Sequence, residues 1–154
     1  MMETTEKKLQ EMGISLPTPP TPGGNYLPWR MAGNQLYLAG VIAVRDGEMT
    51  HTGQLGANQT VESGYEAARV CALNVLAGIK GALGSLDRVD AILYMSGYVN
   101  AVAGFEQSPQ VINGASDFFV EVFGEKGKHA RAAVAVAGLP KNSSVELQAV
   151  VAFS

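Results

Sequence analysis

Apolar residues along this chain recur with two different spacings, which separate helices from strands. Between residues 61 and 83 they fall three or four apart, as on one side of a helix, and Thr60 is suited to cap its start. A second stripe begins at Ser108-Pro109, with the serine as N-cap and the proline at the first helical position, and ends at Gly124. The chain therefore contains two amphipathic helices, each with one face to bury.

Short runs rich in β-branched and aromatic residues, bounded by Gly, Pro or Asn, predict strands. They fall at residues 26–31, 35–44, 48–51, 89–99, 131–136 and 144–153. The run at 89–99 is bulky on both faces, which predicts a central strand covered on one side by the helices and on the other by a partner. The order β-β-β-α-β-α-β-β is that of an α+β domain, with two helices on one face of a mixed sheet.

The first 24 residues have no place in that order. Residues 3–12 are charged, with Leu9 and Met12 as apolar positions, and predict a short surface helix or a frayed end before Gly13. Residues 17–24 hold four prolines and two glycines, which predicts an extended connector. We therefore divide the chain into an N-terminal extension, residues 1–24, and a domain, residues 25–154.

The composition is that of one acidic globular domain. A chain of 154 residues, 47% of them apolar, can bury a single core. Its net charge of −3 does not suggest a surface for nucleic acid, so we expect no such partner. No apolar run reaches the length of a membrane span, and the N-terminus lacks the apolar core of a signal peptide. We expect a cytoplasmic protein with no membrane partner.

Residues suited to disulfides or metals are scarce. Cys71 is the one cysteine, which excludes an internal disulfide, and it lies in the apolar stripe of the first helix as a small core residue. His51 and His129, the only histidines, lie in loop-like sequence, where a solvated side chain is the usual outcome. Two histidines without a cluster of cysteines or carboxylates do not form a metal site, so we expect no metal.

Each of the last two predicted strands carries one charged residue. Arg131 begins the first, and Glu146 lies in the second, on the face opposite Val145 and Leu147. The Gly-Leu-Pro-Lys-Asn turn between them predicts an antiparallel hairpin, in which a loop of residues 137–140 would place the two charges opposite each other. Such a pair on a wet face would stabilise the fold by little.

The same residues resemble the signature of the RidA/YjgF family, the reactive-intermediate deaminases, also labelled L-PSP endoribonucleases. The signature stands here as Ala130-Arg131, Leu139-Pro140-Lys141 and Val145-Glu146, and further blocks follow the same order: Asn25-Tyr26-Leu27-Pro28, Leu36-Tyr37-Leu38-Ala39-Gly40, Val111-Ile112-Asn113-Gly114 and Phe123-Gly124. The wording Gly-Ala-Ser-Asp and Gly-Lys-His-Ala-Arg resembles a divergent subgroup. The resemblance implies a chorismate-mutase-like fold and a homotrimer, whose sheets form an inner barrel with three clefts between subunits.

The resemblance also implies a reaction. Family members hydrolyse enamines or imines made from amino acids, releasing ammonia and a 2-oxo acid without a metal or an organic cofactor. Arg131 can bind the carboxylate of such a ligand with two parallel hydrogen bonds, and Glu146 can act as general base toward water. Tyr26 matches the cleft tyrosine of the family, and Asn113 matches an asparagine near the cleft.

Two departures from the family pattern leave alternatives open. Ala133 stands where cysteine or serine is usual, and Ala39-Gly40-Val41 stands where Ser-Gly-Gln is usual, so polar groups are missing near the expected cleft. One alternative is a non-catalytic module that holds a small carboxylate at Arg131. The other is an endoribonuclease, which the acidic composition and the lack of a basic stripe disfavour.

Overall fold

The computed structural model of the chain describes residues 4–154, so the expected start of the first helix at Glu3 lies outside the described residues. The α-helices are α1 (Thr5–Glu11), α2 (Val61–Leu83) and α3 (Ser108–Phe123). The strands are β1 (Trp29–Ala32), β2 (Gln35–Leu38), β3 (Val41–Ile42), β4 (Val44–Arg45), β5 (Glu48–Met49), β6 (Val89–Asn100), β7 (Ala130–Val136) and β8 (Val145–Phe153). Short 3₁₀ helices are η1 (Leu86–Arg88), η2 (Gly124–Gly127) and η3 (Pro140–Asn142).

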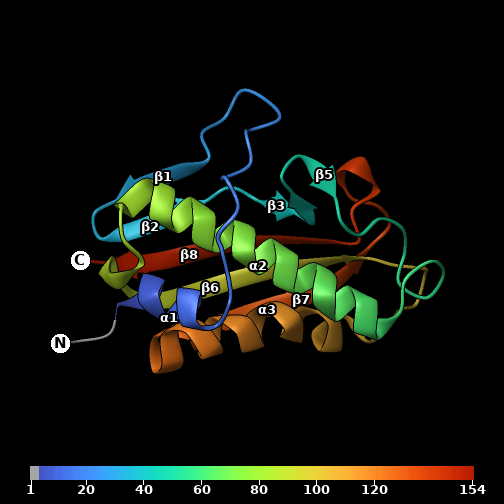
Figure 1. Ribbon diagram of the computed structural model, residues 1–154. Coiled ribbons are helices and arrows are strands. Elements are labelled where there is room, and N and C mark those ends of the chain that lie inside the picture. The colour runs from blue at the N-terminus through green and yellow to red at the C-terminus, as the bar shows by residue number, and fades with distance from the viewer. Residues whose placement is uncertain (1–3) are drawn as a thin grey trace.

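One mixed sheet forms the body of the domain. Its strands run in the order β1-β2-β8-β6-β7, with β3 also paired to β8. β6 and β7 are parallel, and the other neighbouring strands are antiparallel. Helices α2 and α3 cover one face, and no helix of the described residues covers the other (Figure 1). The predicted α+β class, with two helices on one face of a mixed sheet, is confirmed.

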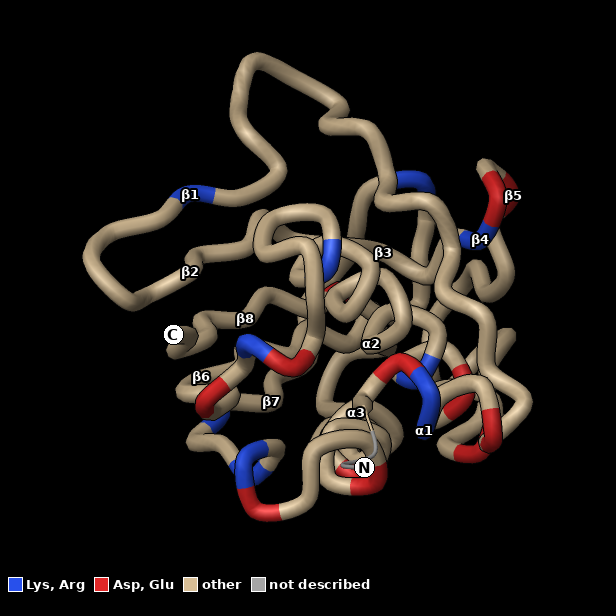
Figure 2. Tube along the Cα trace, turned by 60° about the vertical axis from the view of Figure 1, so that its left-hand side comes forward, with Lys and Arg blue, Asp and Glu red and all other residues tan. Residues whose placement is uncertain are grey.

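The uncovered face of the sheet is partly apolar. The pairing places Tyr37 of β2, Val150 of β8 and Tyr94 of β6 side by side on it, and Val134 of β7 lies opposite Tyr98. Tyr37, Tyr94 and Val134 are 46%, 41% and 46% exposed. Charged residues of both signs are scattered over the helices and turns (Figure 2). β6 lies between β8 and β7, so its predicted position inside the sheet is confirmed. Within this one chain, the second face of β6 is open.

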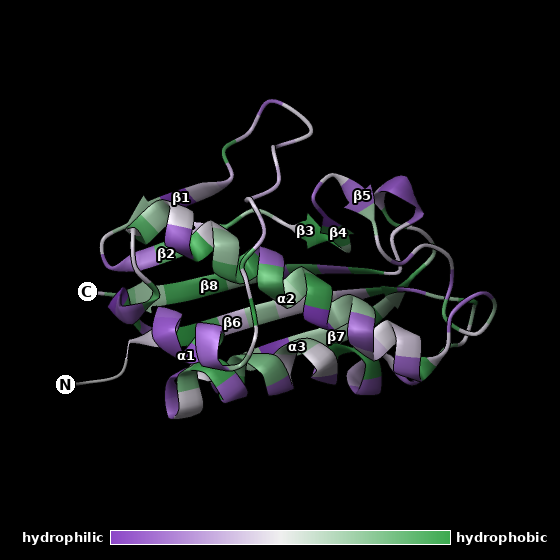
Figure 3. Cartoon of the chain, in the orientation of Figure 1, coloured by the Kyte–Doolittle hydropathy of each residue, from purple (hydrophilic) through white to green (hydrophobic). Residues whose placement is uncertain are grey.

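The two long helices bury their apolar stripes against the other sheet face (Figure 3). α2 begins with the predicted cap, since Thr60 and Ser63 each bind the backbone N–H of the other. α3 begins one residue earlier than predicted: Ser108 is its first residue and Gln107 occupies the cap position without a side-chain bond. The predicted serine cap is therefore wrong, and the Ser108 side chain is buried instead.

The predicted hairpin between the last two strands is wrong. β6 lies between β7 and β8, parallel to the first and antiparallel to the second. The chain leaves β6, passes through α3 and returns as β7, which lies beside β6 and runs in the same direction, as in a crossover between parallel strands. β8 then takes the more buried place on the other side of β6, because Val145, Leu147 and Val151 all need cover and are fully buried there.

The early strands are shorter than predicted. The first begins only at Trp29, the third spans two residues, and the run at 35–44 is divided into β2, β3 and β4. One break falls at Gly40, where the carboxylate of Glu146 fills the space beside the Cα. The other falls at Ala43, where Asn74 of α2 binds the carbonyl groups on both sides of the corner.

The N-terminal segment packs against the domain. Leu9 of α1 is 2% exposed and belongs to the main core. The backbone N–H and hydroxyl of Thr5 both donate to Asp87, and the Leu86 N–H donates to Glu6, which ties α1 to η1. The connector then passes across α2 to reach β1 (Figure 1). Burial of Leu9 makes α1 a structural part of the fold.

Candidate functional site

Glu146 lies on the open face of the sheet near its centre. It pairs with Tyr98 of β6 on one side and Ile42 of β3 on the other. The side chain is half-buried, and no hydrogen bond or ion pair joins its carboxylate to any residue between 4 and 154. Burial raises the pKa of Glu146 above its usual value. A carboxylate without a protein partner and with a raised pKa is suited to accept a proton from a ligand or water.

The space beside Glu146 depends on Gly40. A side-chain carbon at this position would lie 2.7 Å from Oε2 of the glutamate. Gly40 also lines a small cavity of about 50 Å³ together with Tyr26, Pro28 and Trp29. Tyr26 is 53% exposed, and its hydroxyl accepts a hydrogen bond from the N–H of Gly23 at 3.0 Å. Asn74, Val75 and Gly78 of α2 line the same cavity and Glu146 does not, so Gly40 has Glu146 beside it and Tyr26 across a cavity on the helix side.

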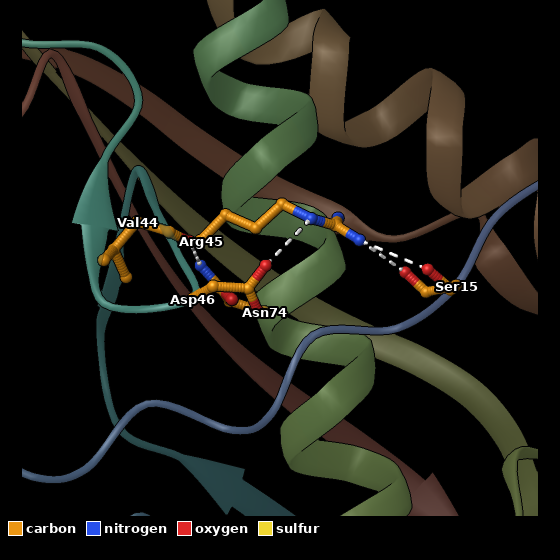
Figure 4. Close-up of polar contacts among 5 residues, drawn as sticks. All are labelled: Ser15, Val44, Arg45, Asp46 and Asn74. Atoms are coloured by element: carbon orange, nitrogen blue, oxygen red, sulfur yellow. Dashed lines mark hydrogen bonds and ion pairs between the residues drawn. The ribbon is translucent and has the colours of Figure 1, made fainter.

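Asn74 is a residue of this region that the sequence analysis missed. It is buried on α2, and its Nδ2 donates to the carbonyl oxygens of Ile42 at 3.1 Å and Val44 at 2.8 Å (Figure 4). In the same corner, Arg45 donates to the Ser15 carbonyl at 2.9 Å (Figure 4). These hydrogen bonds fix the backbone of residues 42–45, which follow Gly40. The sequence signal that could have revealed Asn74 is an amide side chain within an otherwise apolar helix stripe.

Arg131 lies at the other edge of the sheet, and its side chain turns toward α3. Its Nη1 donates to Ser116 Oγ at 2.9 Å and its Nη2 donates to the Pro109 carbonyl at 3.3 Å. Asn113 lies on the same side of α3, because positions 109, 113 and 116 are spaced by four and three residues. Helical spacing thus places Asn113 on the side of α3 that Arg131 contacts, and these are the two predicted ligand-binding residues.

Arg131 and Glu146 do not share a face within one chain. Arg131 pairs with Met95 of β6, a buried residue on the helix side, whereas Glu146 pairs with Tyr98 on the open side. The two charges therefore do not lie opposite each other, the arrangement that a hairpin with a loop of residues 137–140 would have given. Within one chain, Glu146 lies on the open face, and Arg131 lies on the helix side against α3.

His129 is not the solvated histidine that the sequence suggested. It is half-buried, and its ring meets the ring of Phe119 edge to face with centroids 5.8 Å apart. Both ring nitrogens have partners, Ser116 Oγ and the Gly127 carbonyl. Burial lowers the pKa of His129, and the nearby charge of Arg131 acts in the same direction, against the bond to Gly127. Ser116 and His129 were not among the predicted site residues.

The chain belongs to the YjgF/chorismate-mutase-like family. The family model, described as "YjgF/chorismate_mutase-like, putative endoribonuclease", matches residues 6–152. "Protein TCP17" of Trypanosoma cruzi is 44% identical over 144 residues, which cover 93% of this chain and 90% of that protein. The predicted family is thus confirmed.

Solved structures agree with the assignment. Atu1372 of Agrobacterium tumefaciens is 40% identical, with a TM-score of 0.90 over 98% of this chain and 94% of that one. A protein of Shewanella oneidensis named "a putative endoribonuclease" is 34% identical, with a TM-score of 0.94 over 98% of this chain and all of that one. RidA of an Antarctic Psychrobacter, 23% identical over 87% of this chain and 93% of that one, shares the fold with a TM-score of 0.62.

Proposed function

We propose that this protein is a hydrolytic deaminase of enamines or imines derived from amino acids, which releases ammonia and a 2-oxo acid. The observation that carries the proposal is the pair of complementary groups in its fold. Glu146 offers a half-buried carboxylate without a protein partner and with a raised pKa. Arg131 offers a guanidinium held at an accessible sheet edge. An amino-acid imine needs both, because it carries a carboxylate and must be attacked by water.

Each step can be assigned to a residue. Arg131 binds the substrate carboxylate through two N–H groups, with Asn113 beside it. Glu146 takes a proton from water as the oxygen bonds to the imine carbon. Glu146 returns this proton to the nitrogen of the tetrahedral adduct. The adduct then collapses: its hydroxyl gives its own proton to the nitrogen as the C–N bond breaks, so the nitrogen leaves as ammonia with both protons of the water and the carbon becomes the carbonyl of the 2-oxo acid. Tyr26, which lines the same cavity as Gly40, closes over the substrate in this proposal. No metal or organic cofactor takes part.

We further propose a homotrimer, in which each cleft combines Glu146 and Tyr26 of one subunit with Arg131 and Asn113 of the next. The two groups lie on different faces of one sheet, so a second copy is the simplest way to bring them together. The apolar open face, with Tyr94 41% exposed, also needs cover. Light scattering should give a mass three times the chain's 16.2 kDa; a monomer would contradict this proposal.

Ammonia release from freshly generated amino-acid imines tests the reaction. Glu146→Gln should keep the shape of the side chain, remove the base, and lower kcat by at least about 100-fold. Glu48→Gln, a change at an exposed glutamate in the β4–β5 hairpin, is the matched control and should leave kcat unchanged. Equal turnover in Glu146→Gln and the parent protein would remove Glu146 from the mechanism. Binding of 2-oxo acids without any turnover would favour a non-catalytic binding module.

Mixed trimers test the shared cleft. Arg131→Ala and Glu146→Gln should each be inactive alone. When the two variants are refolded together in equal amounts, about a quarter of the clefts regain both intact residues, so about a quarter of the parent activity should return. Activity that stays absent in the mixture, while each residue is needed singly, would place both residues of a site in one subunit.

Endoribonuclease action is less well supported, although the family description and the Shewanella neighbour carry that word. The net charge is −3, and basic residues lie scattered among acidic ones (Figure 2). A ribonuclease needs positive charge along the RNA backbone, and its RNA affinity would fall steeply with salt. Salt-sensitive RNA binding and cleavage would support this function.

No helix among residues 4–154 is long and apolar enough to cross a membrane. The cytoplasmic location stays a prediction.

A further inference from the structure

One directed chain of hydrogen bonds leads away from the Arg131 guanidinium. Arg131 Nη1 donates to Ser116 Oγ at 2.9 Å, Ser116 Oγ lies 2.9 Å from His129 Nε2, and His129 Nδ1 lies 2.7 Å from the Gly127 carbonyl. A carbonyl oxygen can only accept, so Nδ1 carries a proton. Nε2 of the neutral ring is then an acceptor, and the Ser116 hydroxyl donates to it. The serine oxygen is left to accept from Arg131.

Packing holds the end of this hydrogen-bond series that lies at His129 and Gly127. Gly127 is buried at the end of η2, which contacts α3, and the His129 ring stands edge-on against Phe119 of that helix. Burial in this position and the charge of Arg131 both favour the neutral ring. The orientation of the ring therefore sets the direction of the serine hydroxyl, and the serine oxygen sets the position of Nη1.

The arginine keeps donors for a ligand. A guanidinium has five N–H groups; Ser116 takes one and the Pro109 carbonyl takes another. The three that remain suffice for a carboxylate bound by two parallel hydrogen bonds. An arginine whose orientation is set in advance loses less conformational freedom on binding than one that is free to rotate.

We propose that Ser116 and His129 are positioning residues for Arg131, which orient its guanidinium toward the carboxylate of the substrate. This inference rests on the proposed carboxylate site. It gives a role to Ser116 of the Gly-Ala-Ser-Asp segment and to His129 of the Gly-Lys-His-Ala-Arg segment. Ser116 and His129 act through Arg131, with no bond to the substrate.

Affinity for pyruvate and 2-oxobutyrate, measured by calorimetry, tests the inference. Ser116→Ala removes the link and should raise Kd about ten-fold, and His129→Phe, which keeps the ring contact with Phe119, should do the same. The double variant should bind no worse than either single one, because both break the same chain. Ser116→Thr keeps a hydroxyl and should restore affinity. Unchanged affinity in Ser116→Ala, or additive losses in the double variant, would overturn the proposal.

A matched control and a ligand-free measurement complete the test. Ser15→Ala removes the hydroxyl from another serine–arginine contact, 3.4 Å from Arg45, and should leave Kd unchanged. NMR of the unliganded parent should show His129 protonated at Nδ1 alone at pH 7.5. Exchange of the Arg131 side-chain N–H groups should quicken in Ser116→Ala and His129→Phe. A charged or Nε2-protonated ring, or unchanged exchange, would overturn the positioning role.

The NMR measurement also separates the proposed carboxylate site from the proposed positioning role of Ser116 and His129. If the parent protein binds no 2-oxo acid, the proposed carboxylate site fails. The exchange of the Arg131 N–H groups still decides whether Ser116 and His129 hold the guanidinium.

Discussion

Replacement of Gly40 by alanine tests whether catalysis depends on the position of the Glu146 carboxylate. The new methyl carbon would lie 2.7 Å from Oε2, while ordinary contacts begin at 3.4 Å, so the carboxylate must retreat by about 0.7 Å. A displacement near 1 Å at a reacting group can cost about 100-fold in rate. We therefore expect kcat to fall by about 10- to 100-fold. KM should change less than about three-fold, because Arg131 is not displaced.

Stability should hardly change in this variant. Gly40 lies outside the left-handed region of backbone conformation, and the atom that the methyl group meets is the mobile end of a half-buried side chain. The melting temperature should therefore stay within about 3 °C of the parent protein's. Ammonia release and thermal melts are measured side by side.

The matched control is Gly138→Ala. No atom lies within 4 Å of the carbon added there, and its backbone also lies outside the left-handed region. This variant should match the parent protein in rate and melting. If Gly40→Ala also turns over imines at the parent rate, the position of the Glu146 carboxylate does not limit the reaction, and the assigned role of the base is refuted.

Three further predictions concern stability. Gly114→Ala should lower the free energy of unfolding by about 1–3 kcal/mol in denaturant titrations, because the new carbon overlaps the Tyr65 carbonyl oxygen and pushes α3 from α2. Leu9→Ala should cost about 2–3 kcal/mol, since Leu9 is 2% exposed; a loss under about 0.5 kcal/mol would show that α1 is detached. Glu146→Gln should stabilise the protein at pH 7, where the raised pKa of Glu146 makes its ionised form unfavourable to folding. This gain should shrink as the pH falls through that raised pKa toward 4.5, and a gain that grows in acid would contradict the burial argument.

Two residues, one wrongly predicted and one missed, illustrate what a sequence pattern leaves out. His129 lies in loop-like sequence, but its ring packs against Phe119 and binds Ser116, thirteen residues earlier in the chain. Asn74 lies within an apolar stripe, and its role follows only from the carbonyl groups of the β3–β4 corner. Both side chains serve partners that the fold brings near them, and a local pattern contains no information about such partners.

Local spacing, caps and ordered blocks of residues were enough to predict the two long helices, the central strand β6 and the family. Tertiary structure decided how the last two strands pair. A hairpin would have paired β7 with β8, which follow each other along the chain. Instead both strands pair with β6, one on each side of it. Side chains alternate between faces along a strand, so this pairing, rather than any residue type, put Arg131 on the helix side and Glu146 on the open side.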